Sequence, residues 1–300
     1  AISNSGLRFP LEERFGPKAL RGVGGTRDCD WWFTDEAVLL DTAGRYTTQD
    51  SDVGRDSSGW DGFLSMLKKY RKRRPINGVF VALSVSDLIH NNEAERTAHA
   101  NAIKQRIQEL REKLGVNPPV YMLFTKCDLI SGFTEYFDDL GRDEREQVWG
   151  LTFSIQSQDN LSREQMSAAF NTEFSALLER LNSRLMSRLT QERNTQRRSL
   201  IHAFPHQIAA IKDNADRFLQ EVFGPNRYQE SFLLRGVYFT SGTQEGTPID
   251  RMMGSLATNF GLDREAAPMF SGQGRSYFLT GLFQDLVFEE SDIVGSNKKL

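Results

Sequence analysis

Two residues in the stretch AVLLDTAGRY, residues 37–46, have the types and spacing to bind a metal-bound phosphate. An apolar run leads directly into Asp41, and Gly44 follows three positions later. A carboxylate that ends a buried strand can hold Mg²⁺, commonly through water, while a glycine amide can approach a terminal phosphate without a side chain in the way. Asp and Gly are also common in any turn after a strand, so this motif alone does not identify such a site.

A second candidate, TKCD at residues 125–128, follows the apolar run VYMLF. Its nucleotide-binding residues are Thr125, Lys126 and Asp128. An aspartate in this position can accept two hydrogen bonds from a guanine edge, while the lysine stem lies along the ring. A base without those donors would leave the carboxylate unpaired, which is how such a site rejects it. The alternative is that Asp128 caps the next turn; its place after DTAG favours the nucleotide.

Two weaker stretches extend this pattern. Guanine-binding proteins often place a Ser-Ala-Lys loop after a later strand, and here Thr240, Ser241 and Gly242 stand there without a lysine. We therefore predict that the site prefers guanine, and adenine remains an alternative base. Upstream, GVGGT ends in Thr26, whose hydroxyl could complete a Mg²⁺ shell together with Asp41. A plain glycine-rich turn explains GVGGT equally well.

The loop that should hold the phosphates is absent from these 300 residues. A G-x-x-x-x-G-K-[ST] loop is expected roughly 40 to 60 residues before the DTAG strand, and no Gly-Lys pair occurs in the chain. We expect the loop to precede Ala1 in a longer protein, with AISNSGL beginning the helix after it. Without the lysine and the amide cradle, the chain as given should not hold a nucleotide tightly, and we predict no cofactor for it.

No residue is assigned as catalytic. Signalling GTPases often have a glutamine after DTAG that orients the attacking water. Arg45 stands there in this sequence. It can stabilise negative charge but cannot act as that glutamine does, so we expect any hydrolysis to be slow or to depend on a partner.

Apolar runs and amphipathic stretches alternate along the first half of the chain. Strands are predicted at residues 37–41, 78–85 and 118–126, with a later one at 233–241. Between them, helical spacing predicts one helix that ends before Pro75 and another over residues 93–114, ended by Gly115. This alternation predicts an α/β fold: a mostly parallel sheet with helices on both faces, of the P-loop NTPase-like, small GTPase-like kind.

The alternation of strand and helix patterns stops between about residues 160 and 222, where the sequence predicts no strand. Ser162 and Gln165 form a capping-box pattern before one apolar helical stripe, and a second stripe runs from Ile201 to Val222 with Pro205 inside it. Proline should kink or split that second helix. We therefore predict a helical subdomain inserted before the last strand.

These signals divide the chain into four parts. Residues 1–150 are predicted to form the NTPase-like α/β domain without its phosphate loop, and residues 151–226 the helical subdomain. Residues 227–265 add the last strand and helix, and residues 266–300 form a C-terminal helical segment next to a membrane.

Composition restricts the function classes. The chain has 39% hydrophobic and 26% charged residues and a formal net charge of -3, so it is typical of globular proteins and offers no electrostatic footprint for nucleic acid. No apolar run approaches the ~20 residues of a membrane span. Cys29 and Cys127 lie far apart without metal-ligand spacing, as in a reducing compartment. The basic run at 68–74 is interpreted as a solvated helix end rather than a lipid contact.

The sequence resembles the cytoplasmic domain of the TssM/IcmF family over nearly all of its length, in the stretches SGLRFPL, GVGGTRDCDWWFTDEAVLLDTAGRYTTQD, FTKCDLI, FTSGTQEGTPIDRM and LVFEESDIVG. The resemblance implies an inner-membrane subunit of the bacterial type VI secretion membrane complex, with this domain on the cytoplasmic side. It implies as partners a TssL-like membrane subunit, a TssK-like baseplate protein, other copies of the same protein, and a TssJ-like lipoprotein reached through a distant periplasmic region.

Two functions follow from these observations. The leading hypothesis is an NTPase-like scaffold domain that docks the sister membrane subunit and the baseplate during assembly. The rival is an enzyme, a switch that hydrolyses GTP or ATP to gate assembly and needs the missing loop. The nucleotide-binding residues would be Thr26, Asp41, Gly44, Thr125, Lys126, Asp128 and Ser241, with Thr26 and Asp41 on Mg²⁺.

Overall fold

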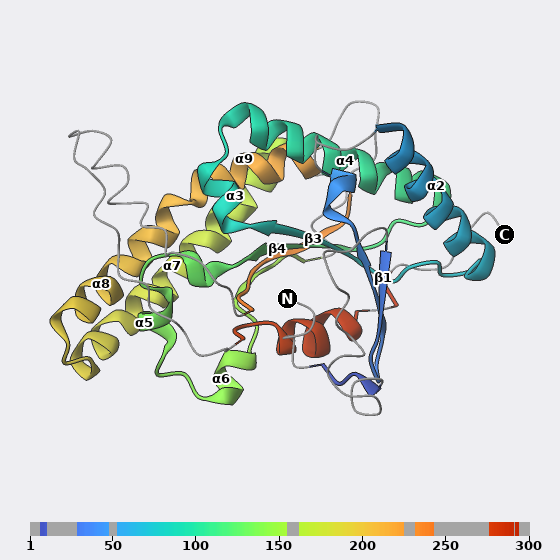
Figure 1. Ribbon diagram of the computed structural model, residues 1–300. Helices are drawn as coiled ribbons and strands as arrows, with labels where there is room; N and C mark the ends of the chain where they lie inside the picture. The colour runs from blue at the N-terminus through green and yellow to red at the C-terminus, as the bar shows by residue number, and fades with distance from the viewer. Residues whose placement is uncertain are drawn as a thin grey trace.

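The computed structural model describes residues 7–10, 29–47, 53–154, 162–224, 232–242, 276–290 and 292–293. Its main sheet has four strands in the order β3-β4-β6-β5 (Figure 1). The first three run parallel, and β5 pairs antiparallel with β6. Their bounds are Val79–Ser84 for β3, Val120–Thr125 for β4, Gly150–Thr152 for β5 and Leu234–Phe239 for β6.

A separate two-stranded hairpin stands beside this sheet. It consists of β1 (Cys29–Phe33) and β2 (Val38–Thr42), which pair antiparallel. Neither strand pairs with β3 among the residues that the structure describes. The hairpin and β3 are connected in sequence through the short helix η3 (Gly44–Thr47) and the helix α2 (Val53–Tyr70).

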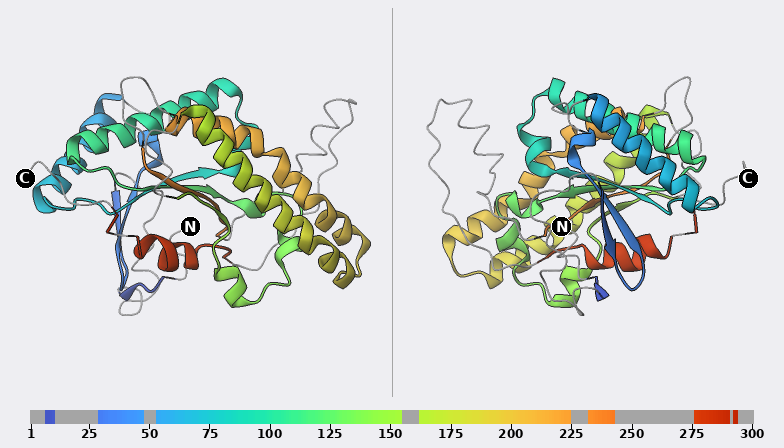
Figure 2. Two further views of the ribbon diagram at one scale, coloured as in Figure 1. Left: turned by 180° about the vertical axis from the view of Figure 1, so that it is seen from behind. Right: turned by 45° about the vertical axis from the view of Figure 1, so that its right-hand side comes forward.

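Helices cover the sheet on both sides. Figure 1 shows α2, α4 and α9 over one side and the C-terminal segment η6 on the other, and Figure 2 shows the same layers from behind. The elements not yet defined are α3 (Val85–His90), α4 (Glu93–Leu114), η4 (Cys127–Leu129), α5 (Phe133–Phe137), α6 (Arg142–Glu146), α7 (Arg163–Gln191), α8 (Thr195–Ala210), α9 (Lys212–Phe223) and the π-helical η6 (Leu282–Phe288).

Local signals explain the ends of the longest helices. Asn92 and Glu95 form a reciprocal capping box at the start of α4, and Gly115 ends it in the left-handed conformation. Ser162 and Gln165 form the predicted capping box of α7. Within the described ranges, no helix has the combination of length and apolar character that crossing a membrane requires.

The core is richest in aromatic residues where α5, α7 and α8 meet the sheet. Strand β4 is buried along Val120–Phe124, as expected for a parallel strand covered on both faces. Beside it Phe133 packs edge-on against Phe204, with ring centroids 5.9 Å apart. Gly132 permits this approach: its φ is +85°, and a Cβ there would lie 2.4 Å from the carbonyl oxygen of Leu200.

Strand and helix predictions from periodicity are confirmed for β2, β3, β4 and β6 and for α2, α4 and α7. The predicted split at Pro205 is wrong: α8 continues through this buried proline and ends at Ala210, and Ile211 separates it from α9. Strands β1 and β5 were not predicted. β5 straddles the predicted boundary at residues 150–151, so its last residues belong to the sheet rather than to the helical subdomain. The helix predicted to follow the last strand, within residues 227–265, lies outside the described residues.

Candidate functional site

The TKCD and TSG stretches meet at the carboxyl ends of the adjacent strands β4 and β6. Main-chain pairing continues past β4, because the Thr240 amide donates to the Phe124 carbonyl (2.9 Å) and the Cys127 amide to the Thr240 carbonyl (3.1 Å). This brings the side chains together: the Ser241 hydroxyl donates a hydrogen bond to Asp128 Oδ1 at 2.5 Å. Two sequence-predicted residues, 113 positions apart, are therefore in direct contact.

Burial shapes the chemistry of this corner. It raises the pKa of Asp128 above its ordinary value, while the hydrogen bond from Ser241 and the charge of Lys126 act in the opposite direction. A carboxylate held at one oxygen by a hydroxyl can offer its other oxygen to donors of a ligand. Asp128 is the second residue of η4, whose N-cap is Lys126, and no side-chain capping hydrogen bond forms there.

Lys126 occupies the turn between β4 and η4 in a left-handed conformation, with φ 59°. Such a conformation is uncommon for a residue other than glycine and costs roughly 1 kcal/mol or more. Strained backbone of this kind concentrates at functional sites, although an observed strain identifies only a position worth testing. It turns the chain so that Asp128 follows directly at the strand end.

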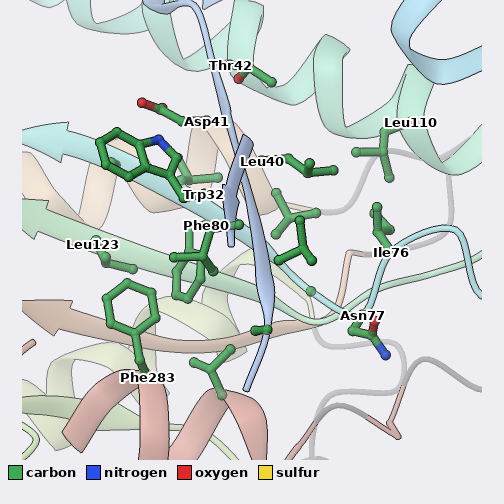
Figure 3. Close-up of a pocket in the computed structure, with 18 of the residues that line it drawn as sticks. Trp32, Leu40, Asp41, Thr42, Ile76, Asn77, Phe80, Leu110, Leu123 and Phe283 are labelled. Carbon is green, nitrogen blue, oxygen red and sulfur yellow. The ribbon is translucent and has the colours of Figure 1, made fainter. Parts of the chain in front are cut away.

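Asp41, Gly44 and Thr125 line a cavity of about 1180 Å³ beside the hairpin (Figure 3). Asp128, Lys126 and Ser241 are not among its lining residues. The structure therefore divides the predicted set into two groups, which adjoin where Thr125 leads into Lys126. The Thr125 hydroxyl donates to the Leu83 carbonyl at 3.4 Å, which ties the end of β4 to β3. Thr26 lies outside the described residues.

Sequence reasoning missed one carboxylate near Asp41. The hairpin register places Asp30 of β1 directly opposite Asp41 of β2. Side chains of such a cross-strand pair share one face of the hairpin. Together with burial, the two carboxylates raise the pKa of the nearby Cys29 thiol to about 11. Asp30 could have been proposed from the sequence only if strand β1 had been predicted. The DTAG motif that led to Asp41 lies on β2.

The donor set fits a cation that is also held by phosphate. Mg²⁺ in phosphate-transfer sites commonly takes one or two protein carboxylates and completes its shell with water and phosphate oxygens. Asp41 and Asp30 supply that number of carboxylates. Within the described ranges, no three His, Cys, Asp or Glu side chains form a group that could hold a metal by themselves.

Apolar side chains from two layers enclose the cavity. One layer, from α2 and α4, contains Trp60, Leu67 and Leu110. The opposite layer contains Leu279, which precedes η6, and Phe283 of η6. The indole Nε1 atoms of Trp32 and Trp60 are buried without a hydrogen-bond partner, and both residues line this cavity. Among the described residues, the only other buried side-chain polar atom without a hydrogen-bond partner is Asp216 Oδ1.

The aromatic residues of β1 divide between the two faces of the hairpin. Trp32 packs edge-on against Phe9, with ring centroids 5.8 Å apart. Trp31 and Phe33 point to the other face, where they stack on each other and remain 43% and 46% exposed.

Comparison with known proteins identifies the family. The IcmF-related N-terminal domain matches residues 54–300. The type VI secretion system component TssM1 of Pseudomonas aeruginosa is 56% identical over all 300 residues, and the chain spans 27% of the length of that relative. No solved structure matches the chain. The chain belongs to the TssM/IcmF family.

Proposed function

We propose that this chain is an assembly domain of a type VI secretion membrane complex and that it works by docking other subunits. Its 56% identical relative, over the whole chain, is named as a type VI secretion component. In the proposed setting the full-length protein lies in the bacterial inner membrane with this domain on the cytoplasmic side. The proposed partners are a TssL-like membrane subunit, a TssK-like baseplate protein and further copies of the protein. A TssJ-like lipoprotein would be reached only through a distant periplasmic region.

The observation that carries this proposal is the projecting hairpin of α7 and α8. Figure 1 shows it extending away from the sheet. Near the far end of α7, Met186 is 71% exposed, and exposed methionines are common on protein-binding surfaces because the side chain adapts to its partner. A projecting element of this kind can reach a second protein without disturbing the sheet.

The α7–α8 hairpin is held firmly close to the turn between its two helices, two residues from Met186. The guanidinium of Arg188 on α7 is buried and donates to the Tyr136 and Glu135 carbonyls at 3.0 and 2.8 Å and to the Asp138 carboxylate at 2.7 Å. Arg197 of α8 also pairs with Asp138. Both helices are therefore fixed to α5 and the turn after it, and a rigid surface loses little conformational entropy on binding.

A matched pair of substitutions in the full-length protein tests this proposal. We expect Met186→Asp to weaken co-purification of the TssL-like and TssK-like subunits by about tenfold or more, because a charge at the centre of an interface costs 1–3 kcal/mol or above. Met66→Asp is the control, because Met66 is also exposed (39%) but lies on α2. Equal effects of the two substitutions, or crosslinks confined to the α/β part, would contradict docking by the α7–α8 hairpin.

The contact between Asp128 and Ser241 favours a second candidate, a nucleotide switch. The fold class proposed for it is P-loop NTPase-like, with the phosphate loop upstream of this chain. Thr125, Lys126, Asp128 and Ser241 would surround the base, and Asp41 and Gly44 would face the metal and the terminal phosphate. Bound Mg²⁺ would supply charge neutralisation of the phosphates. With Arg45 after DTAG, hydrolysis would need a partner or remain slow.

Titration of the full-length protein with fluorescent GTP and ATP analogues in the presence of Mg²⁺ separates the two candidates. A switch binds one of them at micromolar concentration, and Asp128→Asn reduces the preference for GTP over ATP by about 100-fold, because a site built to pair buried polar groups discriminates strongly. Absence of binding in a folded protein leaves docking as the function. Ser241→Ala serves as the milder variant that keeps the carboxylate.

A further inference from the structure

We infer that one end of the molecule, formed by the last turn of α2, the basic residues that follow it and the exposed face of the β1–β2 hairpin, binds the surface of an anionic phospholipid membrane. The inference depends neither on nucleotide binding nor on docking by the α7–α8 hairpin. It rests on a run of positive charge, on exposed aromatic side chains and on the placement of both at the same end of the fold.

The positive charge lies at residues 68–74, and six of these seven side chains are lysine or arginine. All seven residues are exposed. Among the described residues, the only carboxylate that forms an ion pair with this run is that of Asp292, the partner of Arg74. The run therefore keeps most of its charge open to solvent, in a chain whose formal net charge is -3.

The helix dipole of α2 does not explain this many charges. Cations stabilise the C-terminus of a helix, but the effect is confined to the last turn. α2 ends at Tyr70, so Lys68 and Lys69 lie in that turn, whereas residues 71–74 follow it. The solvated helix end that the sequence favoured therefore accounts for two of the six charges. Like charges this close repel one another, and an anionic surface would relieve that repulsion.

Exposed apolar side chains gather on the same elements. The described part of the chain exposes seven large hydrophobic side chains, and five of them lie on β1, β2 and α2: Trp31, Phe33, Val38, Met66 and Tyr70. Trp31 and Phe33 stack on each other, with ring centroids 6.3 Å apart. Tyr70 is 73% exposed and stands inside the basic run itself, where the ammonium group of Lys69 lies 5.2 Å from the centroid of its ring.

Both features lie at one end of the molecule. In Figure 1 the β1–β2 hairpin and the end of α2 stand at the right-hand side, and the views in Figure 2 keep them at one end. The turn between α7 and α8 lies at the opposite end. A membrane at the end with the basic run would therefore leave the α7–α8 hairpin pointing away from the lipid.

This combination fits lipid headgroups better than an acidic protein. Clusters of four to eight lysine and arginine residues are typical of segments that bind anionic lipids. Tryptophan and tyrosine collect at the level of the headgroups, because their rings are apolar and carry a polar group. Protein interfaces, by contrast, are depleted in lysine, whereas three of the six cations in this run are lysine.

Flotation of the 300-residue chain with phospholipid vesicles tests the inference. We expect binding to phosphatidylcholine vesicles that contain about 30% phosphatidylglycerol and little binding to phosphatidylcholine alone, because each cation adds attraction to an anionic surface. Raising the salt concentration from about 0.1 to 0.5 M should release the chain, since screening shortens the reach of the charges. Equal binding to both kinds of vesicle would overturn the inference. Capture by immobilised polyglutamate without binding to anionic vesicles would overturn it too, by assigning the run to an acidic protein.

Matched double substitutions separate the basic run from net charge. Lys69→Gln with Lys72→Gln should lower the partition coefficient into anionic vesicles by about 30-fold, because each cation contributes about fivefold. Arg193→Gln with Arg198→Gln removes the same charge at exposed positions beside and on α8, and should change the coefficient by less than about threefold. Unchanged urea midpoints show that both variants fold. Equal losses in the two doubles would overturn the inference, because net charge alone would then explain binding.

The contribution of the aromatic pair is tested separately. Trp31→Ser should weaken binding to anionic vesicles by about tenfold, since the indole would leave the headgroup layer. Val148→Ser is the control, because Val148 is also exposed (39%) but lies between α6 and β5. Full binding by Trp31→Ser would overturn the assignment of the β1–β2 hairpin to the membrane surface.

Lysine methylation carries the test into the full-length protein, held in the same two kinds of vesicle. Lys69 and Lys72 should react several-fold more slowly when phosphatidylglycerol is present, because bound headgroups cover them. Lys212, at the start of α9, should react equally in both. Equal reactivity of Lys69 and Lys72 in the two kinds of vesicle would overturn the inference.

Discussion

The region around α5, α7 and α8 and the region around the β1–β2 hairpin both have apolar walls, but only the first is filled. In the first, Phe204 is fully buried and packs within 4.9 to 6.4 Å, between ring centroids, of four other aromatic rings. In the second, Trp32, Phe80 and Phe283 border a cavity of about 1180 Å³.

This difference comes from the sheet and not from the composition of the walls. β4 and β6 have hydrogen-bonded neighbours on both sides, so helices can close over them completely. β2 and β3 each have a neighbour on one side among the described strands. The cavity therefore lies where β2 and β3 each have no second strand beside them among the described residues.

The largest expected effect is on the free energy of unfolding, and it compares one phenylalanine from each of the two regions. Phe204→Ala should lower the free energy of unfolding by about 3–5 kcal/mol, because the surrounding rings cannot collapse into the space. Phe80→Ala should cost only about 1–2 kcal/mol in the 300-residue chain, since this side chain already borders the cavity and is only partly buried.

Urea denaturation of both variants measures this difference. Equal costs in the 300-residue chain would mean that the hairpin region is packed as well as the helical one.

An intermediate effect is expected where η6 is fastened to the sheet. Glu290 accepts a hydrogen bond from the Tyr121 hydroxyl at 2.9 Å and pairs with Arg235 at 2.7 Å, with side chains only 14% and 13% exposed for the ion pair. Glu290→Gln leaves the buried guanidinium without its counter-charge and should cost about 3 kcal/mol.

The exposed pair between Arg74 and Asp292 supplies the control, since Asp292 is 83% exposed. Asp292→Asn should leave the urea midpoint unchanged, because exposed pairs contribute little. A loss of stability in Asp292→Asn as large as in Glu290→Gln would show that burial does not distinguish the two pairs. Faster hydrogen exchange in residues 280–290 of Glu290→Gln alone would locate the damage at η6.

The smallest effect is expected at His99, where α4 packs against α9. His99 of α4 packs edge-on against Phe218 of α9 at 6.2 Å. Burial lowers the pKa of His99 below its ordinary 6.5, and Asp87 opposes this shift. Between the lowered pKa and 6.5 the unfolded chain binds more protons than the folded one, so stability rises with pH across this window and is lost as pH falls.

Urea midpoints at pH 5.0 and 7.5 measure this dependence. His99→Gln should narrow the difference between the two midpoints, because the titrating group is removed. His202→Gln, at an exposed position on α8, should leave the difference as it is. An unchanged difference in His99→Gln would assign the pH dependence to other groups.

Sequence patterns predicted the elements whose causes are local. The capping residues Asn92 and Ser162 and the end at Gly115 define α4 and α7, and the apolar run of β4 shows its double burial. Pro205 was misjudged for a physical reason: burial of its ring in the packed α8 compensates for the hydrogen bond that proline removes, so the helix continues.

The candidate site was predictable as a set of residue types but not as an arrangement. DTAG, TKCD and TSG identified Asp41, Asp128 and Ser241 before any fold was known. The contact of Ser241 with Asp128 and the placement of Asp30 opposite Asp41 depend on which strands pair and in what register. Pairing of segments far apart in the chain leaves no local periodicity to detect.

The sequence by itself determined the helices and the buried strands, because capping and periodicity act within a few residues. It also determined the family, through motifs that remain recognisable over the whole chain. Only the tertiary structure decided that β5 joins the sheet, that the hairpin stands apart from β3, and that a cavity separates them. These outcomes depend on hydrogen bonds and apolar contacts between distant segments, whose balance is set only when all layers of the molecule pack together.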